Sequence, residues 1–369
     1  MDVVHIINNL PVGGAERFLL QLAPAQVRLG WRPRVLTLVE PNALAEELVC
    51  SGVEHRCMGR RRLNDPRLVL DLRRALRELR PDVVHTHLFY ADTFGRVAAR
   101  AAGVPAIVST EHSTEGGRLS LRRRTGMRWT APFAHRIVAV SEAVRRRTAA
   151  RLGLPASQIR VIPNGIDLEP WNTVEPLPRE ELRVPADALV VGCVGRVVDA
   201  KGYDLLLRAV AGIAEPRLRV LMVGEGPERP SLEEQTVRLG LEEKVRWLRF
   251  RGDVPRILKT VDVFALPSRW EGHSVALLEA MAAGCACLIS DIPELTETLG
   301  EAGVRVQAGD SGSIAAGLRQ LLDSAERRAE LGAAARQAVR RFSIMNAAQQ
   351  YADLYNGVLE DVKSRRNPV

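Results

Sequence analysis

The chain has 369 residues, of which 46% are hydrophobic and 26% are charged. This length predicts two domains, and the composition excludes a disordered chain, a collagen and a coiled coil. The formal net charge of +8 is unevenly distributed, because residues 1–170 carry +10 and residues 171–369 carry −2. The first half is therefore the part that attracts anionic partners.

Short hydrophobic runs alternate with amphipathic segments through the first 165 residues. The pattern predicts strands at 3–7, 35–39, 83–87, 106–110, 137–140 and 159–163. Helices are expected between them, for example at 15–29 and 68–79, where hydrophobic residues recur every three or four positions. Strands that alternate with helices predict a parallel sheet covered on both faces.

The alternation restarts after a proline-rich, irregular segment at 166–187, where we place a linker. Further strands are expected at 189–194, 218–223, 245–250, 261–266 and 287–290. We therefore predict an α/β protein with two doubly wound, Rossmann-like domains, at 1–170 and 171–344, that face each other across a cleft. Ligands of such sheets bind beyond the carboxyl ends of the strands.

Two glutamates flank an expected helix start in the second half. The strand at 261–266 is followed by a loop that carries Glu271, and Ser274 is a good N-cap residue for the next helix. Free N–H groups at a helix start can bind a phosphate. Glu279 lies about two turns further on, in a hydrophobic run where an acid is either paired or functional. Two carboxylates beside a phosphate site suit a sugar and a ribose, with ordinary surface glutamates as the alternative.

Two cations follow the strand at 189–194. Arg196 and Lys201 lie on the loop before a helix expected from Tyr203. Together they can hold a diphosphate and stabilise it as a leaving group, although two solvent-facing charges are the alternative. The loop lacks the Lys-Ser/Thr ending of a P-loop, and no G-x-G-x-x-G occurs after a strand, which disfavours a dehydrogenase.

The first half offers weaker signals at its strand ends. Gly13 and Gly14 follow the first strand and let the backbone approach a ligand beside a helix N-terminus. His112 follows the strand at 106–110 and could bond a sugar hydroxyl or a phosphate, or could be structural. His85 and His87 share one face of their strand. Without a carboxylate partner we expect them to be structural and not metal ligands.

Basic and hydrophobic residues are interleaved between 116 and 130. They are Arg118, Leu119, Leu121, Arg122, Arg123, Arg124, Met127, Arg128 and Trp129. A basic amphipathic segment of this kind predicts contact with an anionic membrane surface, with a solvated loop as the alternative. Nucleic acid is the least favoured partner, because aromatic residues make up only 4% of the chain and no stacking platform is visible.

Neither a metal site nor a membrane span is expected. No Asp-x-Asp occurs and the five cysteines form no C-x-x-C pair, so fixed cations would have to neutralise a leaving group. The chain opens with an acid, Asp2, where a signal peptide carries basic residues, and the longest hydrophobic stretch, 274–290, contains Glu279. We expect a cytoplasmic protein, peripheral on the inner face of the plasma membrane, that needs no cofactor or metal.

Taken together, these motifs resemble the retaining glycosyltransferases of family 4, which have the GT-B fold. The resemblance rests on Glu271…Glu279, Gly195-Arg196…Lys201-Gly202, the segment VIPNGID at 161–167, and Gly13-Gly14-Ala15-Glu16. The motifs occur in the order of the family and span nearly the whole chain. The family often has glycine where Ser274 stands, which leaves the helix cap intact.

The resemblance implies a role for each motif. Arg196 and Lys201 would bind the donor diphosphate, Glu279 the ribose, and Glu271 the transferred sugar. The other implied contacts are the backbone of Gly272, His273, Ser274 and Val275 beside the sugar, His112 near its hydroxymethyl group, Gly13 and Gly14 near phosphates or acceptor, and Phe250 and Arg251 near the nucleobase. The last helix, expected at 345–362 within a segment 345–369, would cross back to the first domain.

The leading interpretation is a glycosyltransferase that moves a sugar from a nucleotide-diphosphate sugar to a lipid-linked or polysaccharide acceptor. Retention of anomeric configuration is implied by the resemblance alone. One alternative is a nucleotide-sugar 2-epimerase on the same two-domain plan, which would need no acceptor channel. The other is a non-catalytic nucleotide-sugar-binding protein, against which the intact set Arg196, Lys201, Glu271 and Glu279 argues.

Overall fold

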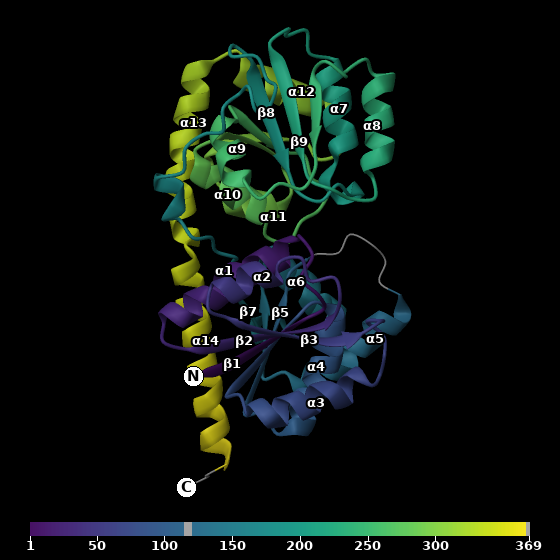
Figure 1. Ribbon diagram of the computed structural model, residues 1–369, viewed down its shortest axis with the longest axis vertical. Coiled ribbons are helices and arrows are strands. Elements are labelled where there is room, and N and C mark those ends of the chain that lie inside the picture. The colour runs from purple at the N-terminus through teal and green to yellow at the C-terminus, as the bar shows by residue number, and fades with distance from the viewer. Residues whose placement is uncertain (114–119, 367–369) are drawn as a thin grey trace. The chain divides into compact units, whose positions relative to one another are not determined.

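A computed structural model describes residues 1–113 and 120–366, and it divides the chain into two compact units. Unit 1 consists of Met1–Gly165 together with Ile344–Val369, and unit 2 is Ile166–Ser343. The sequence predicted domain boundaries after residues 170 and 344, and the two units divide after Gly165 and Ser343. Each unit has its own sheet (Figure 1). Each unit also has its own hydrophobic core.

Unit 1 is built on a seven-stranded parallel sheet. In spatial order its strands are β3 (Glu54–Arg60), β2 (Arg32–Val39), β1 (Asp2–Ile7), β4 (Val83–His87), β5 (Ala106–Glu111), β6 (Arg136–Ala139) and β7 (Ile159–Val161). Every pairing is parallel, and the strand order reverses between β1 and β4. The carboxyl ends of β1 and β4 therefore mark a switch point, where open α/β sheets bind ligands.

Helices cover both faces of this sheet because successive side chains of a strand point to opposite sides. They are α1 (Gly14–Arg28), α2 (Ala45–Cys50), α3 (Leu68–Leu79), α4 (Phe89–Ala102), α5 (Leu121–Thr130), α6 (Glu142–Leu152) and α14 (Ile344–Arg366). Ile6 and Leu36 lie in a core shared with α3 and α4, whereas Ile7 and Val35 lie in a core shared with α1 and α2. All four side chains are fully buried.

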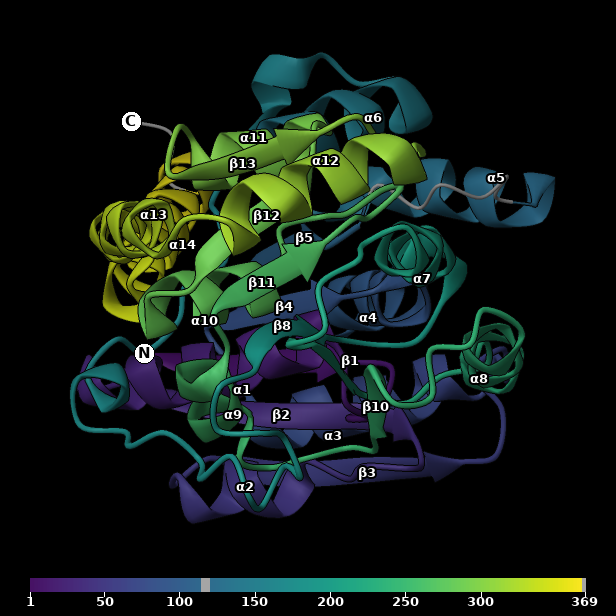
Figure 2. The ribbon, with the colours of Figure 1, turned by 90° about the horizontal axis from the view of Figure 1, so that it is seen from above.

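Unit 2 has a six-stranded parallel sheet with the order β10 (Val245–Leu248), β9 (Leu218–Val223), β8 (Leu189–Val194), β11 (Val263–Leu266), β12 (Ala286–Ser290) and β13 (Gly303–Val306). Its helices are α7 (Tyr203–Ala211), α8 (Arg229–Arg238), α9 (Val254–Thr260), α10 (Val275–Ala283), α11 (Pro293–Leu299), α12 (Ser311–Leu322) and α13 (Ala325–Ala338). Helix α12 packs on β12 and β13, as Figure 2 shows. The order reverses between β8 and β11, which gives unit 2 a switch point of its own.

The final helix, α14, packs on α1 and β5 of unit 1. Tyr351 and Tyr355 point inward and are fully buried. The hydroxyl of Tyr351 lies 3.0 Å from Oγ1 of Thr110, and that of Tyr355 lies 2.5 Å from Nδ1 of His85. A helix that follows unit 2 in the sequence is thus part of the core of unit 1.

Two strands escaped the sequence analysis. Strand β3 lies at the edge of its sheet, where its residues are exposed or half-buried, and its sequence contains no hydrophobic run. Strand β13 is also an edge strand, with only Val304 and Val306 buried. The strands expected to reach residues 163 and 250 end earlier, at Val161 and Leu248.

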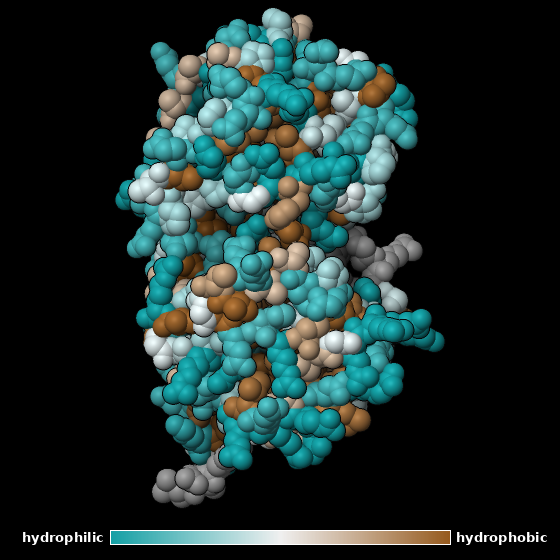
Figure 3. All heavy atoms as spheres, viewed as in Figure 1, coloured by the Kyte–Doolittle hydropathy of each residue, from teal (hydrophilic) through white to brown (hydrophobic). Residues whose placement is uncertain are grey.

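Among the described residues, no helix is long and hydrophobic enough to cross a membrane. On the face shown in Figure 3, hydrophobic residues are scattered in small groups between hydrophilic ones.

Candidate active site

The switch point of unit 2 brings together two loops that are far apart in the sequence. One loop follows β8 and leads to α7, and the other follows β11 and leads to α10. Since β8 and β11 are neighbours in the sheet, both loops leave it at the same edge. The predicted donor site is therefore expected at this edge.

The two loops are fastened to each other by close contacts. Gly202 has φ +63°, and a Cβ there would lie 2.2 Å from the carbonyl oxygen of Pro267, so only glycine fits. The backbone N–H of Arg269 donates to the carbonyl oxygen of Ala200 at 2.8 Å. The Arg269 guanidinium also pairs with Asp204 at 2.9 Å. These contacts fix the spacing between the charged side chains on the two loops.

Lys201 and Glu271, predicted from separate motifs, are in direct contact. Lys201 Nζ lies 2.5 Å from Glu271 Oε1, and the Ser268 hydroxyl donates to the same oxygen at 2.8 Å. The two charged side chains are only 15% and 11% exposed, so the pair is largely shielded from solvent. Arg196 is exposed on the same loop as Lys201. The sequence analysis did not single out Ser268, which holds Glu271 in position.

Helix α10 begins directly after this pair. Ser274 is its N-cap, and the Ser274 hydroxyl accepts a hydrogen bond from the backbone N–H of Leu277 at 3.4 Å. Gly272, His273 and Val275 are buried around the helix start. The positive end of the helix dipole thus lies on the same loop as Glu271.

The side chains near α10 have different environments. The buried His273 ring meets Phe342 edge to face at 5.0 Å, and burial lowers the pKa of His273 to about 3, so the ring is neutral. Glu279 is half-buried on α10, although its neighbours Leu278 and Ala280 are fully buried. A carboxylate at such a position can reach solvent and ligands from an otherwise hydrophobic helix.

The residues expected near the nucleobase follow β10. Phe250 is 49% exposed, and Arg251 forms two hydrogen bonds with the carboxylate of Asp253, at 2.7 and 2.6 Å. That pairing raises the pKa of Arg251 and lowers the pKa of Asp253. Because its guanidinium is occupied by Asp253, Arg251 offers mainly its backbone to a ligand.

Unit 1 carries the remaining predicted residues at its own switch point. Gly13 is the N-cap of α1 and Gly14 is its first residue. The carboxylate of Glu16 folds back so closely that a Cβ on Gly13 would lie within 2.3 Å of it. His112 follows β5, and its ring centroid lies 6.0 Å from that of Phe18 on α1. The glycines and His112 therefore lie near the same helix.

His85 and His87, expected to be structural, belong to a cluster of four histidines. His5 Nδ1 lies 3.0 Å from His87 Nε2, and His87 Nδ1 lies 3.0 Å from His112 Nε2. Burial lowers the pKa of His5 to about 4 and that of His112 to about 3, and it holds those of His85 and His87 well below the ordinary range. All four rings are therefore neutral at pH 7.

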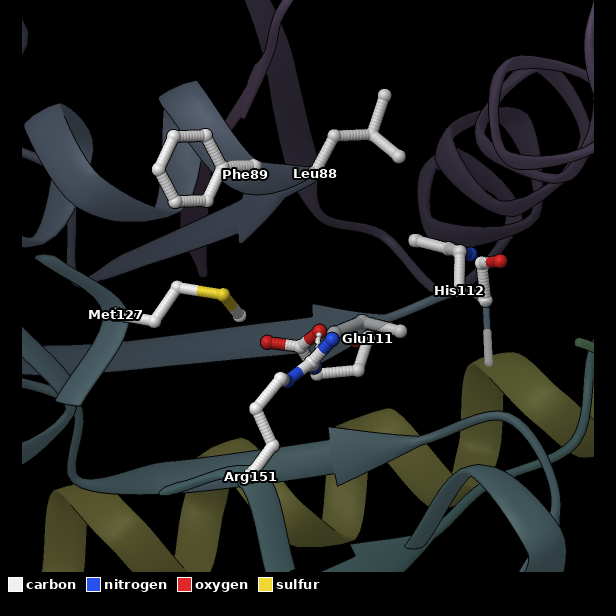
Figure 4. A pocket seen from close by; sticks show the side chains of 8 residues that line it. Leu88, Phe89, Glu111, His112, Met127 and Arg151 are labelled. Atoms are coloured by element: carbon white, nitrogen blue, oxygen red, sulfur yellow. Dashed lines mark hydrogen bonds and ion pairs between the residues drawn. The ribbon is translucent and has the colours of Figure 1, made fainter. Parts of the chain in front are cut away.

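A pocket opens beside His112 in unit 1 (Figure 4). Its lining residues are Leu88, Phe89, Thr110, Glu111, His112, Ser113, Met127 and Arg151. In Figure 4 the Arg151 guanidinium points at Glu111, and the two groups are 2.5 Å apart. The pocket therefore combines a hydrophobic side with an ion pair and a neutral histidine.

A cluster of buried charged residues lies next to Glu111, one of the residues that line the pocket. Arg96 is fully buried, with Nη2 at 3.7 Å from Asp92 and 3.8 Å from Glu111, and its Nε donates to Ser109 at 2.7 Å. Burial raises the pKa of Asp92, although Arg96 opposes the shift. This cluster could not be predicted from sequence, because Asp92 and Arg96 have the i,i+4 spacing of an ordinary surface ion pair on a helix.

Comparison with known proteins identifies the family. Residues 12–170 match the family model Glycosyltransferase Family 4, and residues 175–338 match Glycosyl transferases group 1. The phosphatidyl-myo-inositol mannosyltransferase of Mycobacterium leprae is 31% identical over 94% of this chain and 93% of its own length. The chain belongs to glycosyltransferase family 4. The lipopolysaccharide core biosynthesis glycosyltransferase LpsD of Rhizobium meliloti is 30% identical, with coverage of 96% and 98%.

The fold of this glycosyltransferase is GT-B, as the sequence analysis predicted. The structure of Anabaena HepE in complex with UDP and glucose superposes with a TM-score of 0.86 at 23% identity, over 97% of this chain and 100% of HepE. The predicted enzyme class is confirmed by family membership, which favours glycosyl transfer over the epimerase and the non-catalytic binding protein.

Mild acid should destabilise the glycosyltransferase. Burial lowers the pKa of all seven histidines from 6.5, so below pH 6.5 the unfolded chain binds protons that the folded chain does not. Each fully buried histidine then removes up to about 1.4 kcal/mol of unfolding free energy per pH unit. Asp92 acts in the opposite direction, because its raised pKa favours the folded state as the pH falls.

Calorimetry at pH 7 and pH 5 measures this balance. We expect the thermal midpoint to fall by several degrees on acidification, since the buried histidines outnumber Asp92. A midpoint that stays constant or rises would contradict the assignment of neutral, buried histidines.

Proposed function

We propose that this glycosyltransferase transfers a sugar from a nucleotide-diphosphate sugar, with UDP as the nucleotide, to a lipid-linked or polysaccharide acceptor. The observation that carries the proposal is the contact of Lys201 with Glu271 beside the start of α10. This contact brings together two groups at one edge of the sheet: a cation that can bind the diphosphate, and a carboxylate that can accept hydrogen bonds from sugar hydroxyls. The UDP and glucose of HepE, which shares the fold, support the choice of donor.

In this proposal the donor diphosphate lies against the cationic loop of unit 2. Lys201 and Arg196 supply positive charge, and the N–H groups at the start of α10 supply further donors to phosphate oxygens. Charge that develops on the leaving diphosphate is stabilised by groups that are already in place, which lowers the barrier without reorganisation. Fixed cations of this kind make a divalent metal unnecessary.

Glu271 and Glu279 would then orient the donor. Glu271, held by Ser268, accepts hydrogen bonds from hydroxyls of the transferred sugar, and Glu279 accepts those of the ribose. Phe250 and Arg251 border the nucleobase, and the backbone from Gly272 to Val275 borders the sugar. Retention of the anomeric configuration through front-side attack is proposed on the basis of the family.

In unit 1, His112 would contact the hydroxymethyl group of the transferred sugar, and the acceptor would bind beside His112 and the backbone of Gly13 and Gly14. The pocket there offers a hydrophobic side and an ion pair, which suits a saccharide attached to a lipid. The mannosyltransferase of M. leprae carries the name of an inositol lipid, and LpsD is named for lipopolysaccharide core biosynthesis. Both names support an amphiphilic or saccharide acceptor.

Helix α5 has one residue in the pocket and a basic, hydrophobic face toward solvent. Its residue Met127 is buried and lines the pocket, whereas Leu121 and Trp129 are 76% and 67% exposed. Arg122 and Arg124 are exposed between them, and Arg128 is exposed near the end of the helix. We propose that this face rests on the anionic inner leaflet of the plasma membrane, from the cytoplasmic side.

Only part of the predicted basic segment is suitable for a test of membrane contact. Arg118 and Leu119 lie outside the described residues. The Arg123 guanidinium lies over the rings of Phe89 and Tyr90, 5.2 and 5.5 Å from their centroids, so it is engaged within unit 1. Arg122 and Arg124 are therefore the better residues for a test of membrane contact.

Removal of either loop cation should impair transfer. We expect Arg196→Ala and Lys201→Met each to lower kcat roughly a hundredfold, as the loss of one preorganised charge does in other enzymes. Transfer from radiolabelled UDP-sugars to a membrane extract is the measurement, and Arg238→Ala at the exposed end of α8 is the matched control. Near-normal kcat in correctly folded Arg196→Ala and Lys201→Met proteins would exclude the diphosphate role.

Membrane binding is tested with sedimentation of vesicles. The double variant Arg122→Ser/Arg124→Ser should bind vesicles rich in phosphatidylserine roughly 30-fold more weakly, because each arginine contributes about 1 kcal/mol at an anionic surface. Arg74→Ser/Arg77→Ser on α3 removes the same charge from another exposed helix and should bind normally. Equal binding to neutral and anionic vesicles, or equal loss in both double variants, would refute the α5 surface.

A further inference from the structure

Three hydrogen bonds join Gln26 on α1 to His112 through the interior of unit 1. His5 Nε2 lies 2.8 Å from Gln26 Oε1, and His5 Nδ1 lies 3.0 Å from His87 Nε2. His87 Nδ1 in turn lies 3.0 Å from His112 Nε2. Gln26, His5 and His87 are fully buried, so each of these contacts is made without competition from water.

The chemistry of Gln26 sets the direction of this chain. A carbonyl oxygen only accepts, so the proton of His5 must be on Nε2. A neutral imidazole has one donor and one acceptor, which makes His5 Nδ1 an acceptor and His87 Nε2 a donor. The same step repeats at the next contact, so His87 Nδ1 accepts and His112 Nε2 donates. His112 Nδ1 is then left with a lone pair.

We propose that Gln26, His5 and His87 act as positioning residues that fix the proton of His112 on Nε2, so that His112 presents Nδ1 as an acceptor to a hydroxyl group of the substrate. Nδ1 of His112 is buried and has no hydrogen-bond partner among the described residues. His112 also lines the pocket of Figure 4. A buried acceptor without a partner is costly, and a ligand hydroxyl would satisfy it. The inference rests on the proposed function, in which His112 contacts substrate.

The proposed chain of hydrogen bonds requires that the histidine rings are neutral. A protonated imidazole has two donors and no acceptor, so a charge on His5 or His87 would make the next ring accept and would move the proton of His112 from Nε2 to Nδ1. Burial lowers the pKa of both rings far enough to prevent this. The His85 ring packs against that of His87 in a tilted arrangement, with centroids 4.1 Å apart. The nitrogens of His85 bond Tyr355 and Thr110, which holds His85 beside His87.

A metal ion is the rival explanation for this cluster. His5, His85 and His87 each offer a nitrogen within 4.8 Å of the others. Both nitrogens of every one of these rings already have a hydrogen-bond partner, from Gln26 and His112 at the ends to Tyr355 and Thr110 at the side. Hydrogen bonds therefore account for the cluster without a metal, and zinc becomes an outcome of the test.

The test is the tautomer of His112, read from ¹⁵N NMR of the full chain labelled at histidine, without ligand. We expect the wild type to carry the proton on Nε2. Gln26→Met has similar size but no acceptor, so His112 should become a mixture of tautomers. Gln26→Glu keeps an oxygen acceptor and should preserve the wild-type tautomer. Because the wild-type spectrum alone tests the direction of the chain, the proposal stays falsifiable if a variant fails to fold.

Three results would contradict the proposed chain of hydrogen bonds. They are a proton on His112 Nδ1 in the wild type, the same single tautomer of His112 in Gln26→Met, and stoichiometric zinc that shifts the signals of His5 and His87. In transfer assays Gln26→Met should lose roughly fivefold in kcat/KM, as expected for one misdirected hydrogen bond, while Gln26→Glu retains activity. A changed tautomer with unchanged transfer would support the chain and would contradict the role of His112 in the proposed function.

Discussion

A fully parallel sheet forces each connection to return across one of its faces, so the loops that follow its strands all gather at one edge. Both units follow this constraint, and the strand order of each sheet reverses once. The reversal lies between β1 and β4 in unit 1 and between β8 and β11 in unit 2. Lys201 and Glu271 are 70 residues apart, yet they meet because β8 and β11 are neighbours. The charged site of unit 2 is thus a consequence of sheet topology.

The two switch points differ in the charge of their side chains: unit 2 has an ion pair, and unit 1 has neutral histidines. In unit 2 the cation and carboxylate form an ion pair that is largely shielded but not fully buried, so a ligand can replace either partner. In unit 1 the histidines are buried so deeply that they stay neutral, and hydrogen bonds alone connect them. A diphosphate donor needs the first kind of surface, whereas a hydroxyl group is best held by the second. The glycosyltransferase proposal assigns these ligands accordingly.

The sequence predicted what depends on local pattern and missed what depends on distant partners. Central strands were visible because burial on both faces requires continuous hydrophobic runs, whereas β3, an edge strand, has none. Ser274 was recognised as a helix cap from its own loop. Ser268 and Gln26 were not singled out, because each matters only through a side chain that the fold brings to it. His85 and His87 were expected to be structural, and their link to His112 needed the packing of β1, β4 and β5.

Binding of UDP and of uridine to the full chain, measured by calorimetry in EDTA and again with Mg²⁺, tests the central claim that fixed cations of unit 2 hold a diphosphate. The account predicts that UDP binds at least about a hundredfold more tightly than uridine in EDTA, because the phosphates meet charged and helix N–H donors already in place. It also predicts that Mg²⁺ changes the Kd for UDP by no more than about twofold. UDP binding that disappears in EDTA and returns with Mg²⁺ would contradict the account.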